Sequence, residues 1–266
     1  MKICCWNTRR ASRTSLETWE YLEEIDPDIV LLQEVNSLSP AIEEQYESYL
    51  LPARTKHGQE QKFGTAILLR GDIIAPLTLS TDWPWCNQVL DHFHGNLVGL
   101  TVDCGANKKL NVLSIYSPAW PIPADLLQDA DVSGVRGKYS KGDLWVMDLL
   151  LSALRGVDLK GEDWILGGDL NSSITFDHLW GTEPRGNLEF LEQMETLGLL
   201  ELLRHHQGHV TPTFCNPRGG QIIHQMDHLF ATPSISARLK SCNVGDQQRV
   251  FSKSLSDHLP IIADID

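Results

Sequence analysis

The sequence contains no long hydrophobic run. No apolar segment approaches the roughly 20 residues that a membrane-spanning helix requires. The first residues, MKICCWNTRRAS, also lack an apolar stretch long enough for a secretory signal peptide. We therefore expect a protein that does not insert into a membrane and that resides in the cytoplasm.

The cysteines form no CxxC pair, which excludes a zinc ribbon and a thioredoxin-like redox site. Cys4 and Cys5 are adjacent in a predicted strand, so their side chains should point to opposite faces of a sheet. We expect buried, reduced thiols at all six positions. These positions are Cys4, Cys5, Cys86, Cys104, Cys215 and Cys242.

An excess of basic residues is also absent. The chain has 22 Lys and Arg residues against 35 Asp and Glu residues, a net charge of −13. A protein that holds nucleic acid mainly by its phosphates carries a basic surface, so this balance weighs against tight, non-specific DNA binding. The acidic excess fits either cation binding or solubility. One local basic cluster, Arg9, Arg10 and Arg13, would either grip a phosphate or lie solvated at a helix start.

No linker, repeat or low-complexity tract interrupts the 266 residues, which are enough for a sizeable core. We expect a single domain over residues 1–266. The loosest stretch, residues 117–142, is rich in Pro, Gly and charge. Because predicted strands continue on both sides of it, we interpret it as a surface excursion.

Hydrophobic spacing predicts alternating strands and helices. Strands are expected at residues 2–6, 27–35, 64–70, 96–103, 109–118, 162–169, 211–214, 225–232, 237–244 and 259–265. Helices are expected at 12–25, 39–50, 141–157 and 185–198, with Ser12 or Thr14 capping the first and Gly198 ending the last. Two packed sheets covered by helices would bury this pattern, an α/β (α+β) fold.

Polar side chains of related chemistry stand at the ends of several predicted strands. Each has an ordinary explanation alone, because Asn and Asp start turns and a terminal Glu is often solvated. Together they offer oxygen ligands for a hard divalent cation beside acid–base groups, which suggests metal-assisted phosphoester hydrolysis. The residues are Asn7, Glu34, Tyr116, Asp169, Asn171, Asp227, Asp257 and His258.

The order of these motifs resembles the endonuclease/exonuclease/phosphatase superfamily. The matching segments are CCWNTR, PDIVLLQEV, GTAILL, SIYSP, GGDLNSS, PTF followed by QMDHLFAT, and SDHLPI. The superfamily includes DNase I, exonuclease III-like AP endonucleases, LINE endonucleases, sphingomyelinases, inositol polyphosphate 5-phosphatases and deadenylases. The resemblance implies a DNase I-like, four-layer α-β-β-α sandwich of two packed mixed sheets flanked by helices.

The resemblance also implies a metal site that holds Mg²⁺ or Mn²⁺. Glu34 matches the principal ligand of the family, and Asn7 and Asp257 match the residues that support the same ion. Both cations accept such an oxygen-rich ligand set.

The remaining matches imply catalytic roles. Asp169 would orient or deprotonate the attacking water, and Asn171 would donate a hydrogen bond to the phosphate. His258 would contact the scissile phosphate, and Asp227 would hold its other ring nitrogen and favour the charged imidazole. Tyr116 stands where nucleic-acid-cleaving members often have a phosphate-contacting tyrosine.

Two departures bear on the substrate. The segment LQEVN lacks the lysine of the LQETK motif in AP endonucleases. Ala119 and Trp120 follow Pro118, where those enzymes tend to have Asn or Gln. The expectation is therefore a nuclease acting on DNA or RNA, without abasic-site repair. The alternatives are a phosphatase or phosphodiesterase for a nucleotide, inositol phosphate or phospholipid headgroup, and a binding module without catalysis. Oligomeric state is left open.

Other histidines and tryptophans receive structural interpretations. His205 and His209 have zinc-helix spacing, but Gly208 and Pro212 favour a polar loop. His92 and His94 alternate on a predicted strand as surface residues. Trp120 would stack on a base in the less favoured interpretation. The other tryptophans in loop-like contexts, Trp83, Trp85 and Trp180, are expected to pack.

Overall fold

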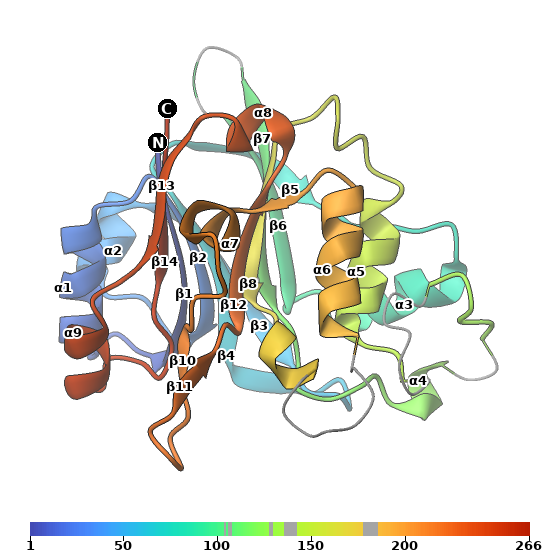
Figure 1. Cartoon of the computed structure of the whole chain (residues 1–266), viewed down its shortest axis with the longest axis horizontal. Coiled ribbons are helices and arrows are strands. Elements are labelled where there is room, and N and C mark those ends of the chain that lie inside the picture. Colours follow the sequence, from blue (N-terminus) through green and yellow to red (C-terminus); the bar gives the residue numbers. More distant parts are fainter. Residues whose placement is uncertain (104, 106–107, 128–129, 136–142, 178–185) are drawn as a thin grey trace.

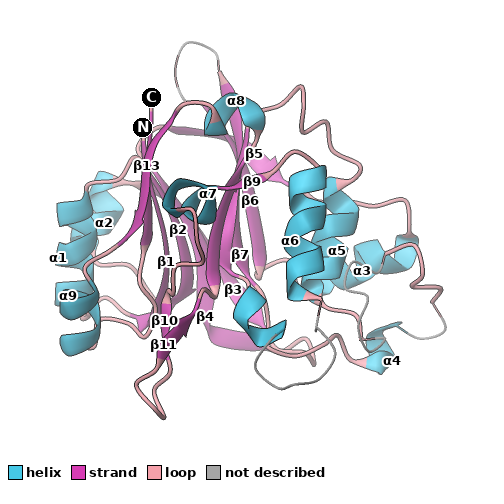
Figure 2. Cartoon of the chain, in the orientation of Figure 1, coloured by secondary structure: helices cyan, strands magenta, loops and turns pink. Residues whose placement is uncertain are grey.

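The computed structural model describes residues 1–103, 105, 108–127, 130–135, 143–177 and 186–266. Two six-stranded mixed sheets pack face to face in the middle, and helices cover both outer faces (Figures 1 and 2). This is the predicted four-layer α-β-β-α arrangement, so the expected fold class is confirmed. Cys104 and Trp180 lie outside the described residues.

The first sheet contains both chain ends and the second contains the central segments. In spatial order, the first consists of β13 (Leu239–Val244), β14 (Ile261–Ile265), β1 (Lys2–Ala11), β2 (Ile29–Val35), β4 (Glu60–Leu69) and β3 (Glu47–Arg54). The second consists of β5 (Asp72–Leu77), β6 (Leu97–Asp103), β7 (Lys109–Tyr116), β8 (Trp164–Asp169), β12 (Asp227–Ala231) and β9 (Leu200–Glu201). A separate hairpin joins β10 (Phe214–Cys215) to β11 (Ile222–His224).

The helices are short and divide between the two outer layers. Against the first sheet lie α1 (Leu16–Ile25), α2 (Pro40–Gln45) and α9 (Gln247–Ser252). Against the second lie α3 (Pro84–His92), α5 (Val146–Leu154) and α6 (Asn187–Thr196). The others are α4 (Ala124–Leu127), α7 (Leu202–Gln207), α8 (Pro233–Ser236) and a 3₁₀ turn at Ile174–Asp177. No helix among the described residues is long and apolar enough to cross a bilayer.

Strand alternation sorts the side chains into three apolar layers. In β1, Cys5 points into the core between the sheets, whereas Cys4 and Trp6 point toward the α1 layer. This confirms that the adjacent cysteines face opposite ways. Four of the five described cysteines are buried free thiols, and Cys215 is only partly buried.

Parallel pairing places the polar strand ends at one edge of the sandwich. β1 pairs with β2 in parallel, and β7 pairs with β8 in parallel. The carboxyl ends of these four strands therefore meet at the lower edge in Figure 1, beside the β10–β11 hairpin. Tyr116 lies opposite Asp169 in the register, and Asp227 at the start of antiparallel β12 lies opposite Asp169 on its other side.

Four local predictions were wrong. Helix α2 ends at Gln45, and residues 47–54 form edge strand β3 because they pair with β4 along its whole length. The cap of α1 is Ser15, since Ser12 lies in the turn before it. His92 ends helix α3, which begins at Pro84, so residues 91–94 form no strand. Finally, residues 202–207 form α7 rather than a loop.

Helix α7 is capped at both ends, although Gly208 and Pro212 led us to expect a loop here. The Glu201 side chain accepts a hydrogen bond from the backbone N–H of Arg204, and Gly208 ends the helix with a φ of 74°. His205 and His206 are exposed on this helix, and His209 is exposed just beyond it. These histidines belong to no cluster of metal-binding groups among the described residues.

Gly168 is required where β8 passes between β7 and β12. Its φ is 156°, and a Cβ atom there would lie 1.8 Å from the carbonyl oxygen of Ile115. We predict that Gly168→Ala lowers the free energy of unfolding by at least about 3 kcal/mol, because the backbone of a central strand must move. Urea denaturation monitored by tryptophan fluorescence measures this.

Gly156→Ala is the matched control. A Cβ at Gly156 would meet its nearest atom at an ordinary 3.5 Å. We expect this variant to change the free energy of unfolding by less than about 1 kcal/mol. Equal effects of the two substitutions would contradict the packing argument.

Candidate active site

A buried carboxylate–imidazole pair stands at the centre of the strand-end cluster. His258 Nδ1 lies 2.8 Å from Asp227 Oδ2, and both side chains are buried. Thr213 donates a second hydrogen bond to the same oxygen at 2.7 Å. Asp227 begins β12, and His258 precedes β14 and bridges to Phe214 of β10. Three separate segments therefore fix this pair.

Asp169 lies on the other side of the imidazole. Its Oδ2 is 3.9 Å from His258 Nε2 and accepts a hydrogen bond from Asn7 Nδ2 at 3.0 Å. Its Oδ1 accepts one from the backbone N–H of Asn171 at 2.9 Å. The Asn171 side chain donates to the carbonyl of Ser117 at 2.8 Å. Asp169 is thus held by two carboxamide residues, Asn7 of β1 and Asn171 of the loop that follows β8.

The charges of this cluster depend on one another. Burial alone would lower the pKa of His258, but the carboxylates of Asp227 and Asp169 outweigh burial and raise it above its usual range. Burial raises the pKa of Asp169. The charge of His258 lowers this pKa and the charge of Asp227 raises it, and the net effect is a raised pKa. The surroundings therefore favour the cationic form of the imidazole, and the Asp169 carboxylate is more basic than that of an ordinary aspartate.

Glu34 and Asp257 lie at the exposed side of the cluster. Their side chains are 20% and 21% exposed, and each faces one arginine. Arg10 Nε lies 3.8 Å from Glu34, and Arg9 Nε lies 3.7 Å from Asp257. Within the described part of the chain, no other basic group lies within 4.0 Å of either carboxylate.

Tyr116 closes the site on the β7 side. Its ring meets Phe63 edge to face, with ring centroids 5.4 Å apart. Burial raises the pKa of the Tyr116 hydroxyl, and the nearby charges of Glu34 and Asp169 raise it further. The hydroxyl therefore stays protonated and can donate a hydrogen bond.

The backbone is strained around the site. Six non-glycine residues in the described segments have a positive φ, and four of them flank this cluster: Arg9, Arg10, Glu34 and Asn171. Such conformations cost about 1–3 kcal/mol each and persist where the surroundings hold them. Such a concentration of strained residues is typical of functional sites.

Two sets of groups could hold a divalent cation. Ligand atoms of Asp169, Asp227 and His258 lie within 4.8 Å of one another, and Asp227 Oδ1 is buried with no hydrogen-bond partner among the described residues. However, a protonated imidazole cannot ligate a metal. Glu34 and Asp257, with the carbonyl oxygen of Asn7, offer the oxygen donors that Mg²⁺ and Mn²⁺ prefer. This set fits such a cation better.

Several supporting residues were not predicted from the sequence. The Ser256 hydroxyl donates to the carbonyl of Asn7 at 2.7 Å and accepts from the backbone N–H of His258 at 3.0 Å. Ser256 thereby ties β1 to the segment before β14, as Thr213 ties β10 to Asp227. Both stand inside recognised motifs, SDH and PTF, which is the signal that could have identified them.

A second buried polar network lies behind the cluster. Gln225 Nε2 lies 3.1 Å from Glu201 Oε1 and 3.3 Å from His228 Nδ1. His228 Nε2 lies 3.0 Å from the carbonyl of Ser172 and donates to it. Burial lowers the pKa of His228 to about 4, so this imidazole is neutral. It fixes the loop that follows Asp169 and Asn171.

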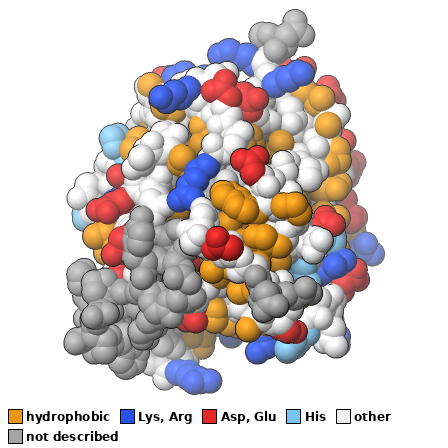
Figure 3. Space-filling view, turned by 90° about the vertical axis from the view of Figure 1, so that its right-hand side faces the viewer, with side chains coloured by type: hydrophobic (Ala, Val, Ile, Leu, Met, Phe, Trp, Pro, Cys, Tyr) orange, Lys and Arg blue, Asp and Glu red, His pale blue; other side chains and the backbone are white. Residues whose placement is uncertain are grey.

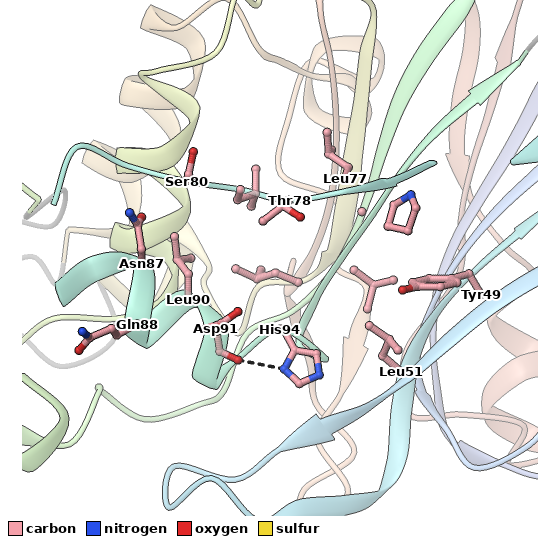
Figure 4. A pocket seen from close by; sticks show the side chains of 15 residues that line it. Tyr49, Leu51, Leu77, Thr78, Ser80, Asn87, Gln88, Leu90, Asp91 and His94 are labelled. Carbon is pink, nitrogen blue, oxygen red and sulfur yellow. Dashed lines mark hydrogen bonds between the residues drawn. The ribbon is translucent and has the colours of Figure 1, made fainter. Parts of the chain in front are cut away.

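A cavity of about 530 Å³ lies away from the cluster, between the β3 and β5 edges and α3. Tyr49 and Leu51 lie on one side of it, and Asn87 and Leu90 lie on the other (Figure 4). His94 Nδ1 contacts the carbonyl of Asp91 there at 2.9 Å. None of the eight predicted site residues lines this cavity.

A family model covers the whole cluster and almost the whole chain. The model of the endonuclease/exonuclease/phosphatase family matches residues 4–258, from the start of β1 to the buried histidine. The chain belongs to this family. Its members hydrolyse phosphoester bonds, and the chain is a phosphoester hydrolase of the same family. No curated protein sequence matches it significantly.

Solved structures agree in fold. An AP endonuclease from Archaeoglobus fulgidus has 19% identity and a TM-score of 0.68, with 100% of this chain and 99% of that chain covered. The 3'-5' exonuclease NExo from Neisseria meningitidis has 18% identity and a TM-score of 0.61, with 100% of each chain covered. The 3' phosphatase NExo from Neisseria, bound to a product DNA hairpin, has 18% identity, a TM-score of 0.62 and coverage of 100% and 99%. At these identities the likeness establishes the DNase I-like fold.

The charge on His258 provides a test of the cluster. We predict that Asp227→Asn lowers the pKa of His258 by at least about one pH unit, because the carboxylate that stabilises the imidazolium is lost while a hydrogen-bond acceptor remains. An NMR titration of the imidazole, assigned with His258→Ala, measures the pKa. An unchanged value would show that Asp227 does not control the charge.

Proposed function

We propose that this protein is a divalent-metal-dependent nuclease that hydrolyses phosphodiester bonds of DNA or RNA by in-line attack of water. The observation that carries the proposal is the buried Asp169 carboxylate facing the His258–Asp227 pair, at the edge where Glu34 and Asp257 remain partly exposed. In the family, this combination of base, cationic imidazole and acidic ligands serves phosphoester hydrolysis.

Asp169 acts on the water. Its raised pKa makes it basic enough to accept a proton, and its contacts with Asn7 and Asn171 fix the direction of its oxygens. A base with a pKa near the working pH is the most effective one, because it is both available and strong enough. Asp169 therefore orients the attacking water and takes its proton.

His258 stabilises the phosphate. Its Nδ1–H is held by Asp227, which leaves Nε2–H of the cationic ring to donate to a non-bridging phosphate oxygen. Asn171 and Tyr116 supply neutral donors to the same group. These donors become stronger partners as negative charge accumulates on the phosphorus-bound oxygens, which lowers the barrier rather than only the ground state.

Glu34, Asn7 and Asp257 hold Mg²⁺ or Mn²⁺ in this proposal. When bound, the cation neutralises charge on the phosphate and leaving oxygens. The carboxylates of Glu34 and Asp257 are partly exposed oxygen donors, and the buried Asn7 side chain offers its amide oxygen, which supports this assignment.

Nucleic acid is the favoured substrate. Arg9 and Arg10 stand beside the cluster, and Trp120 is 38% exposed four residues after Tyr116. One neighbour is named an AP endonuclease and another a 3'-5' exonuclease, and NExo named as a 3' phosphatase is bound to a product DNA hairpin. Trp120 and the arginines offer stacking and phosphate contacts suited to a polynucleotide.

A small phosphoester is the second candidate, favoured by the net charge of −13. The face in Figure 3 carries acidic and basic side chains side by side rather than a basic surface. A substrate with one or two phosphates needs only the local charges at the cluster. The neighbour named as a 3' phosphatase shows that the fold also supports phosphate removal.

The decisive experiment compares metal and variants on several substrates. We expect Mg²⁺-dependent cleavage of linear or circular DNA or of RNA, abolished by EDTA and reduced at least about 100-fold in Asp169→Asn and His258→Ala. His206→Ala, an exposed histidine on α7, is the control and should retain full activity. Gel assays with single-turnover kinetics provide the rates.

Two outcomes would change the assignment. Cleavage that persists in His258→Ala or with EDTA would contradict the proposed chemistry. Intact nucleic acids, together with metal-dependent phosphate release from nucleotides or inositol phosphates that His258→Ala loses, would favour the second candidate.

A further inference from the structure

Two consecutive arginines leave β1 in a conformation that brings them over the acidic edge. Arg9 and Arg10 have φ values of 49° and 64°, and the β1–β2 register shifts between Asn7 and Ala11. The backbone N–H of Arg9 donates to Asn7 Oδ1 at 3.0 Å. This bulge lets neighbouring side chains leave the sheet together instead of alternating across it.

Each arginine faces one of the carboxylates assigned to the cation, without a hydrogen bond. The Nε atoms of Arg9 and Arg10 are 3.7 and 3.8 Å from Asp257 and Glu34. The arginine side chains are 50% and 65% exposed. Ion pairs with this exposure and separation are weak and easily exchanged. A divalent cation and these guanidinium groups therefore compete for the same two carboxylates.

Both arginines also lie against other groups near the cluster. The Arg10 guanidinium lies over the Phe63 ring, 5.2 Å from its centroid, which retains it beside Tyr116. Arg9 lines a polar hollow of about 410 Å³ together with Thr14, Glu17 and Lys253, and Lys253 lies 3.5 Å from Glu17. Because Glu17 balances the charge of Lys253, the half-exposed Arg9 is the cation of this hollow that suits a phosphate flanking the scissile one.

We propose that Arg9 and Arg10 are exchangeable counter-ions of the metal site. They neutralise Asp257 and Glu34 when the cation is absent, and they turn to phosphates flanking the scissile bond when the cation takes those carboxylates. This inference rests on the proposed nuclease function and adds a coupling between metal binding and substrate binding. Metal and a polynucleotide strengthen each other's binding, because each frees the groups that the other needs.

The competition between the arginines and the cation is tested by metal binding, without an activity assay. Free Mn²⁺ is measured by electron paramagnetic resonance during titration of the wild type and of the double variant Arg9→Gln/Arg10→Gln. Loss of two nearby positive charges should tighten Mn²⁺ binding roughly three- to thirtyfold. Arg13→Gln is the matched control, because Arg13 faces Glu43 at 4.0 Å instead of the cluster, and it should leave Mn²⁺ affinity unchanged. Equal melting temperatures verify folding.

The phosphate half uses a fluorescein-labelled oligothymidylate in fluorescence anisotropy, with every protein carrying Asp169→Asn to prevent cleavage. For each protein, the oligonucleotide affinity is measured with and without Mn²⁺, and the ratio of the two affinities is the coupling. We expect this ratio to be at least about three times larger in the protein with both arginines than in the double variant. Arg13→Gln should behave like the protein that retains all arginines.

The outcomes separate the alternatives. Tighter Mn²⁺ binding with an unchanged metal–oligonucleotide coupling indicates simple charge repulsion and overturns the exchange. Mn²⁺ affinity that stays the same or weakens in the double variant also overturns it. If none of the proteins binds the oligonucleotide, the polynucleotide function fails and the phosphate half with it, whereas the Mn²⁺ titration still decides whether the arginines occupy the carboxylates.

Discussion

The buried row of Asp227, His258 and Asp169 is the interaction on which the rest of the site depends. Two acidic side chains flank one imidazole and favour its charged form, so the row places charge inside the protein. Burial of such charge is unfavourable unless each oxygen has partners. Thr213, Asn7 and the Asn171 backbone supply partners to three of the four carboxylate oxygens. Asp227 Oδ1 is buried and has no partner among the described residues, so the row favours positive groups at its open side.

The fold creates this row by bringing strand ends together. Parallel pairing of β1 with β2 and of β7 with β8 places the ends of four strands at one edge, and antiparallel β12 adds Asp227 opposite Asp169. Gly168 lets β8 approach β7 closely enough for this register. The strained backbone at Glu34 and Asn171 then directs their side chains to the edge. Stability of the two sheets thus maintains the strain of the site.

Much of the fold could be predicted from the sequence, because the apolar residues of strands such as KICCW and DIVLLQ are buried and form nearly continuous apolar runs. The candidate site residues lie in short motifs at the ends of such strands, so their type and order singled them out as candidates. Edge strand β3 was mistaken for helix because Ile42, Tyr46 and Tyr49 have helical spacing, and only pairing with β4 decides the matter. Ser256, Thr213 and the Gln225 network escaped prediction because their roles depend on contacts between distant segments.

The most direct measurement is the position of Mn²⁺ in a crystal of the wild-type protein, located by anomalous scattering. The account predicts one peak coordinated by the carboxylates of Glu34 and Asp257, with the His258 imidazole still bonded to Asp227. A peak coordinated instead by Asp169, Asp227 and His258 would contradict it, because the histidine would then be a neutral ligand and not the cation that stabilises the phosphate.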